Sequence, residues 1–293
     1  MRTQKLKKKV IKLNYNNDPM SIQYLNESKT TIIGIKSTTD SDILIPSNVT
    51  RVNFNSSINQ RGRIIFESDS LLSVLENEAF RQSLFSFFDF SKCFKLTILP
   101  QWCFRECIFL EYIELPPNLT FIDQGAFDIC ISLKKIYFPK SLIKTADCII
   151  DHGGIFAGCI KLTNAIFPID SKFEYLGGLT FWHCISLTDL IIPASVVHIG
   201  NKIFGKCEEP RNILILSKKL TVIDGCFLQA INTEFVNIKV TSNEIRTQII
   251  KSTPQLNHGR VTLINMVCTY YYMNNFQLLQ LVGVYFNVFL FIN

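Results

Sequence analysis

Apolar residues recur along the chain in short groups that alternate with polar positions, and these groups repeat at a nearly constant spacing. The clearest marker is Phe-x-x-Cys, which occurs at Phe104/Cys107, Phe127/Cys130, Phe156/Cys159, Phe181/Cys184 and Phe204/Cys207. Successive phenylalanines of this series are 23, 29, 25 and 23 residues apart. A period of this size predicts a repeat architecture, in which each unit buries its apolar side by stacking on its neighbours.

Each clear repeat has the same internal order of apolar, polar and proline positions. In one unit, Ile136 and Phe138 alternate with more polar neighbours, which is the period of a β-strand. Pro139 ends this strand, because proline has no N–H for a sheet ladder. Leu142 follows three residues later, and we expect it in a turn, a 3₁₀ segment or a short helical piece. The predicted fold class is therefore a leucine-rich-repeat-like solenoid of short parallel strands with such returns.

The repeat pattern divides the chain into three parts. Residues 1–41 are predicted to form a basic N-terminal tail and a cap, with a strand at Thr31 to Ile35. Residues 42–228 hold the repeats, which are degenerate at both ends of this range. Residues 229–293 are predicted to form a C-terminal cap followed by an uncharged apolar tail.

Two weaker copies of the marker precede the clear repeats. Phe80 is followed by Ser83 at the position where the cysteine is expected. Phe90 and Cys93 restore the Phe-x-x-Cys spacing, and we interpret this pair as a further copy of the marker.

Two of the later copies are enlarged. One holds six extra residues around 147–154, and the other holds two extra residues between Pro168 and Phe181. Insertions in a solenoid map to surface loops, which often carry function. The simpler interpretation of the larger insertion is a tolerated bulge without a role of its own.

Composition excludes disorder and gives no support to a nucleic-acid-binding protein. The chain has 293 residues, of which 47% are hydrophobic and 18% are charged, so it can bury a continuous core. Its formal charge is +6, and six basic residues lie among the first twelve, with no acid there. The remaining 24 basic and 24 acidic residues cancel, whereas a nucleic-acid binder carries its positive charge on the folded part.

The ten cysteines give no evidence of a catalytic or metal-binding site. Five of them occupy one repeat position, where a stacked solenoid would use cysteine as a small buried apolar residue. No Cys-x-x-Cys pair occurs, and His152, His183, His198 and His258 do not complete a metal-ligand pattern. The glycine pairs lie outside any phosphate-binding arrangement. We therefore predict no catalytic residues, no metal site and no cofactor.

The sequences at the two ends of the chain do not decide in which cellular compartment the protein lies. The N-terminal segment has basic residues but no apolar run of the length found in a signal peptide, which favours the cytoplasm. The segment from Val261 to Asn293 has no charged residue, and 276–292 is its most apolar part. It is short for a transmembrane helix, so membrane contact through this tail is the less favoured alternative to packing on the solenoid.

The pattern Cys-x-x-Leu-x-x-Ile-x-Phe-Pro, followed by Ala-Phe-x-x-Cys, resembles the BspA-like leucine-rich repeats. The best matches are Leu110 to Phe127, Cys130 to Leu142 and Cys184 to Phe204, and the resemblance covers about residues 42 to 228. It implies a curved, non-enzymatic solenoid. Many members are surface antigens or adhesins that bind host or matrix proteins, so the resemblance implies the cell surface.

The residues between the core positions of each strand are predicted to point outward and to contact a partner. They combine aromatic, aliphatic and oppositely charged groups, which suits a protein ligand, or alternatively a glycan, better than a polyanion. In order along the chain they are Tyr112, Glu114, Lys135, Tyr137, Asn164, Ile166, Asp189 and Ile191. The alternative is that the apolar residues among them have only a structural role in the sheet and contact no partner.

The sequence thus predicts a non-enzymatic protein-interaction module of the surface-antigen or adhesin type. A cytosolic leucine-rich repeat scaffold or regulator using the same surface is the alternative, favoured by the thiol ladder and the missing signal peptide.

Overall fold

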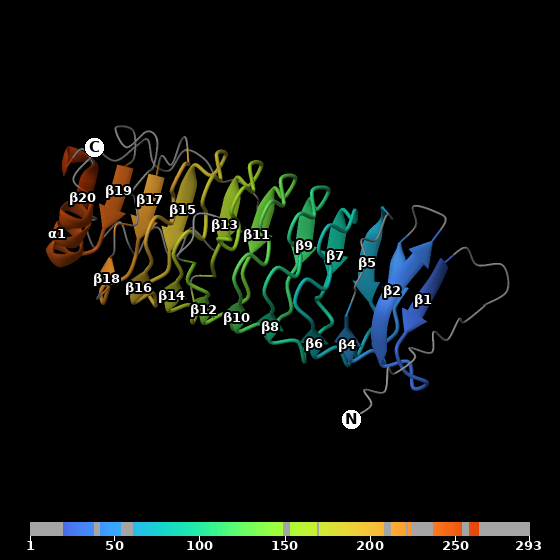
Figure 1. The fold of residues 1–293 in the computed structure, drawn as a ribbon. Coiled ribbons are helices and arrows are strands. Elements are labelled where there is room, and N and C mark those ends of the chain that lie inside the picture. Colours follow the sequence, from blue (N-terminus) through green and yellow to red (C-terminus); the bar gives the residue numbers. More distant parts are fainter. Residues whose placement is uncertain are drawn as a thin grey trace, which may run out of the picture.

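The computed structural model describes residues 20–37, 42–53, 61–148, 153–168, 170–207, 212–220, 222–223, 225, 237–253 and 258–263. These residues form a parallel β-solenoid, as the sequence predicts, with β1 (Met20–Tyr24) and α1 (Asn243–Ser252) at opposite ends of the coil (Figure 1). Each coil contributes a main strand, a short strand and a turn segment, so the core lies between three stacked walls.

The main strands form two parallel ladders along the upper side of Figure 1. The first ladder contains β3 (Ile43–Ile45), β5 (Arg63–Phe66), β7 (Phe87–Asp89) and β9 (Tyr112–Glu114). The second contains β11 (Lys135–Tyr137), β13 (Asn164–Ile166), β15 (Asp189–Ile192), β17 (Asn212–Ile215), β19 (Asn237–Val240) and β20 (Val261–Leu263). Where the ladders meet, Lys134 N donates to Glu111 O at 3.2 Å, which keeps β9 and β11 side by side.

The segment that returns after each main strand contains a second, short strand, where the sequence predicts a turn, a 3₁₀ segment or a short helical piece. This strand belongs to a row of parallel strands of two residues each, along the lower side of Figure 1. These short strands are β8 (Ile98–Leu99), β10 (Phe121–Ile122), β12 (Lys144–Thr145), β14 (Tyr175–Leu176), β16 (His198–Ile199) and β18 (Val222–Ile223).

The N-terminal end of the solenoid carries an antiparallel pair. β1 (Met20–Tyr24) pairs with β2 (Thr31–Ser37), which contains the strand predicted from the β-branched residues. β2 continues in parallel with β4 (Arg51–Val52) and β6 (Val74–Leu75), so the pair joins the short-strand wall. Asn26 closes the hairpin by accepting from Thr30 N at 3.0 Å.

The third wall consists of turn segments that carry the Phe-x-x-Cys series. The rings of Phe104, Phe127 and Phe156 stack on one another, with centroids 5.2 and 5.1 Å apart. Each repeat cysteine donates its thiol to the carbonyl of the phenylalanine one coil earlier; Cys130 to Phe104 O at 3.1 Å is one such bond. The series is therefore a core ladder, in which the side chains are fully buried.

The turn segments stack through backbone hydrogen bonds that a sheet does not use. In each segment, residues with positive φ such as Trp102 and Glu106 flank the buried phenylalanine. This alternation directs every second N–H toward the next coil, so that Trp102 N, Phe104 N and Glu106 N all donate to the following segment. The wall is thus continuous even though its residues have turn geometry.

The pair Phe90/Cys93 is not a member of this ladder, and the sequence interpretation of it was wrong. Phe88 is in register with Ile113, so Phe90 extends β7 and Cys93 follows the strand. Phe80 holds the ladder position instead, because its ring stacks on Phe104 at 5.4 Å. The local spacing matched by coincidence, since phenylalanine also occupies the inward positions of β7.

The last described coil replaces turn geometry with a helix. α1 (Asn243–Ser252) begins after Ser242, whose hydroxyl accepts from Ile245 N at 3.3 Å. It buries Ile245 and Ile249 against the core and ends at Ser252, with Thr253 as its C-cap. A 3₁₀ turn, η2 (His258–Arg260), then leads into β20.

Candidate functional site

The outward side chains of the main strands form two rows, which together we call the strand face. Strand pairing sets their order, because parallel register places equivalent residues of successive strands side by side. The first row contains Arg63, Phe87, Tyr112, Lys135, Asn164, Asp189, Asn212 and Asn237. The second row contains Leu44, Ile65, Asp89, Glu114, Tyr137, Ile166, Ile191, Leu214 and Lys239.

The structure brings all eight predicted contact residues onto this one face. Tyr112 and Tyr137 are the most accessible apolar members, at 45% and 50% exposure. Glu114 is also exposed. The half-buried members are Lys135, Asn164, Asp189 and Ile191.

Ile166 corrects one expectation. The sequence places it among the accessible residues, but it is only 6% exposed. It occupies β13, in register with Tyr137 on β11, and Leu214 of the same row is buried as well, at 2% exposure. We therefore leave Ile166 out of the accessible surface.

The N-terminal half of the strand face is aromatic and charged. Lys134 donates to Glu111 at 2.6 Å, and its Nζ lies 5.2 Å from the ring centroid of Tyr112. The hydrogen bond to Glu111 raises the pKa of Lys134. These contacts hold the ring of Tyr112 while leaving nearly half of it accessible, which suits an anchor for a partner.

In the C-terminal half of the strand face, the first row is a ladder of polar side chains. Asn212 donates its amide to Asp189 Oδ1 at 2.6 Å, and Thr188 donates to the other oxygen of Asp189 at 2.7 Å. Arg260 donates to Asn237 Oδ1 at 3.0 Å. Because these groups satisfy one another, they are better suited to maintaining the sheet than to binding a charged ligand.

Sequence reasoning missed the two outward residues of β7. Phe87 and Asp89 are register partners of Tyr112 and Glu114, so they belong to the same face. The alternation Phe87-Phe88-Asp89-Phe90 carried the signal, since Phe88 and Phe90 are both fully buried. This alternation was overlooked because Phe90 and Cys93 were assigned to the Phe-x-x-Cys series.

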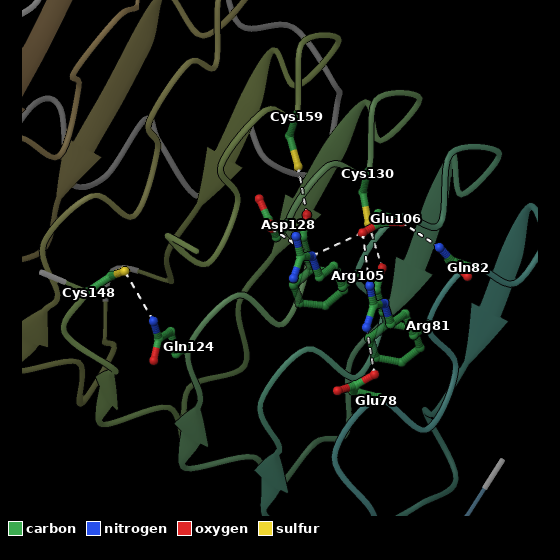
Figure 2. A network of polar contacts seen from close by, with 12 residues as sticks. Glu78, Arg81, Gln82, Arg105, Glu106, Gln124, Asp128, Cys130, Cys148 and Cys159 are labelled. Atoms are coloured by element: carbon green, nitrogen blue, oxygen red, sulfur yellow. Dashed lines mark hydrogen bonds and ion pairs between the residues drawn. The ribbon is translucent and has the colours of Figure 1, made fainter. Parts of the chain in front are cut away.

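The outer side of the turn wall carries an ion-pair network (Figure 2). Arg105 lies between Asp128 and Glu106, with Nε 3.1 Å from Asp128 Oδ2 and 3.2 Å from Glu106 Oε1. Arg81 pairs with Glu78 at 2.8 Å and reaches Glu106 at 3.4 Å. Two guanidinium groups and three carboxylates pair with one another across three coils, so the network is a structural element rather than a site for an ionic ligand.

The repeat cysteines have the environment of core residues. Burial raises the pKa of Cys130 and Cys184 well above the ordinary value, and that of Cys207 to about 12. A thiol in this state is a poor nucleophile and a poor metal ligand at neutral pH. Within the described ranges, no group of three or more His, Cys, Asp or Glu side chains could hold a metal ion.

Of the helices that the structure describes, none is long and apolar enough to cross a membrane. The apolar tail segment 276–292 lies outside the described residues.

Three solved structures resemble the chain at low identity. A leucine-rich cell surface protein from Faecalibacterium prausnitzii is 18% identical over 70% of this chain, with a TM-score of 0.46, and the chain spans 55% of its length. The leucine-rich repeat protein of T. pallidum is 18% identical, with a TM-score of 0.44, over 80% of this chain and 93% of that protein. The pneumococcal vaccine antigen PcpA is 15% identical, with a TM-score of 0.34, over 88% of this chain and 99% of that protein.

No curated protein matches the chain. A family model does match, through six copies of the BspA-type leucine-rich repeat region that span residues 35–152 and 149–257. These ranges contain every main strand from β3 to β19 and the whole ladder of stacked phenylalanines. The chain therefore belongs to the BspA-type leucine-rich repeat family.

Proposed function

We propose that the protein is a non-enzymatic interaction module that binds a protein partner on the strand face. Its repeat family indicates a protein-interaction module, and the observation that supports this location is the exposure of Tyr112 and Tyr137 on adjacent strands. Exposed aromatic residues with nearby charges are typical of binding hot spots.

A protein ligand is better supported than a glycan. One side of the Tyr112 ring is already covered by Lys134 Nζ. A sugar would need such a ring free for stacking, whereas a protein side chain can also approach its edge and its hydroxyl group.

The surface-antigen or adhesin role is the finer part of the proposal, and it rests on the family. A cytosolic scaffold or regulator is the alternative, and the packing of the repeat cysteines as buried thiols supports it. Labelling intact cells with a membrane-impermeant reagent separates the two. We expect the protein to be labelled, and its protection would exclude the surface role.

The binding face is tested with the purified full chain against an array of matrix proteins. For the protein that binds most tightly, replacing both Tyr112 and Tyr137 by Ala should weaken binding about tenfold or more. Phe94→Ala is the matched control, because Phe94 is 55% exposed but lies after β7, outside the strand face. Equal affinity of the double variant and the control would exclude the strand face.

A further inference from the structure

An acidic pair lies within the aromatic half of the strand face. Asp89 on β7 and Glu114 on β9 are register partners, so both carboxylates project from the same side of neighbouring strands. Parallel strands are about 4.8 Å apart, which brings the two charges close together. Among the described residues, no lysine or arginine forms an ion pair with either carboxylate.

Aromatic and aliphatic side chains surround this pair. Phe87 and Tyr112 stand beside the two acids in the first row, and Ile65 precedes Asp89 in the second. The backbone N–H of Lys134 donates to the carbonyl of Glu111, so residues 23 apart lie side by side on β11 and β9. Tyr137 therefore lies next to Glu114. The carboxylates therefore have apolar and aromatic neighbours on three sides, while Glu114 stays exposed and Asp89 half-buried.

The surroundings of Glu114 disfavour its charged form. Partial burial raises the pKa of Glu114, and the neighbouring Asp89 carboxylate adds to the shift. Asp89 accepts one backbone hydrogen bond, from Ser91 N at 2.9 Å, which leaves its second oxygen for another donor. A cation placed between the two carboxylates would relieve their repulsion.

We propose that the strand face over β7, β9 and β11 binds an arginine side chain presented by the partner protein. This inference rests on the proposed function and adds the chemistry of the partner. The planar guanidinium has five donors, so it can contact both carboxylates at once while its flat face packs on Tyr137.

Other cationic ligands fit less well. A hard metal ion prefers six or more oxygen ligands, and this place supplies two carboxylates. An ammonium group is more strongly hydrated and lacks a flat face for the rings. A polyanion is repelled by the pair.

The test selects random peptides displayed on phage against the full chain, and it keeps those that Tyr137→Ala no longer binds. We expect the retained peptides to be enriched in arginine. Replacing that arginine by citrulline, which has similar shape but no charge, should lower affinity for the wild-type chain about tenfold or more. The double variant Asp89→Asn/Glu114→Gln should bind both peptides equally weakly.

Glu174→Gln provides the control, because Glu174 is exposed and directly precedes β14 in the short-strand wall, away from this face. It should bind the arginine peptide as tightly as the wild type does. Peptides that need Tyr137 but show no arginine enrichment, or tolerate neutralisation of both acids, would overturn the arginine site and leave the strand face intact. Failure to find any peptide that depends on Tyr137 would overturn both proposals.

Discussion

The rings of Phe127 and Phe156 are parallel within 7°, with centroids 5.1 Å apart, although 29 residues separate them in the sequence. Phe104 and Phe127, in coils of the usual length, stack at 5.2 Å. The six extra residues of the enlarged coil therefore leave the core ladder unchanged. The repeat tolerates insertions because each coil is held by what it stacks on, and not by the length of chain between its core positions.

Phe127→Ala should be strongly destabilising. Phe127 is fully buried and has a stacked phenylalanine on each side, so truncation leaves a cavity that two neighbouring coils border. We expect a loss of about 3–5 kcal/mol in the free energy of unfolding, measured by urea denaturation. Ile143→Ala, at a side chain 41% exposed, is the control and should cost far less. A similar denaturation midpoint for both variants would contradict the core ladder.

The sequence predicted the fold because one signal was repeated many times. Five copies of Phe-x-x-Cys, four of them followed by a leucine and a proline at fixed spacing, identified the inward positions of the coil. The same periodicity placed Tyr112 and Tyr137 on the outer face, because residues of a strand alternate between its two sides.

The features that the sequence did not predict depend on contacts between neighbouring coils. The burial of Ile166 is not encoded in a local pattern, because Tyr137 and Ile191 occupy the same position of their coils and are exposed and half-buried. The short strands were missed because two residues carry no recognisable period. Asp89 was missed because a degenerate repeat offered two competing registers, and only stacking of Phe80 on Phe104 decides between them.

Stability should fall in alkaline solution as buried thiols are forced to ionise. Burial raises the pKa of Cys207 from 9.0 to about 12, so the folded chain keeps this proton when the unfolded chain has lost it. Since the folded state then binds more protons, the contribution is fully present below pH 9 and is lost as the pH rises from 9 toward 12. Urea midpoints of the wild type and Cys207→Ala, measured across this range, should converge as the pH increases. Parallel pH profiles would count against the buried thiol.

Gly177→Ala should destabilise the chain through a backbone clash. A Cβ at this position would lie 2.0 Å from the carbonyl oxygen of Ala146 on the preceding coil, and a backbone atom cannot move aside cheaply. We expect a loss of about 1–3 kcal/mol, seen as a lower midpoint of thermal unfolding. Gly34→Ala is the matched control, because its nearest contact, at 2.8 Å, is the flexible end of Gln23. If the two substitutions cost the same, the coils are not as closely spaced at Gly177.

The pair of Arg105 and Asp128 should contribute more to stability than an exposed ion pair does. The Asp128 side chain is 5% exposed and lies 3.1 Å from Arg105 Nε, so Asp128→Ala leaves a half-buried guanidinium without this partner. The expected cost is about 1–3 kcal/mol. Lys140 and Asp170, at 68% and 62% exposure, provide the comparison, and Asp170→Ala should cost about 0–1 kcal/mol. A double-mutant cycle with Arg105→Ala isolates the coupling, which should be nearly insensitive to salt for the turn-wall pair because burial limits screening. A coupling near zero would mean that backbone stacking alone holds these three coils together.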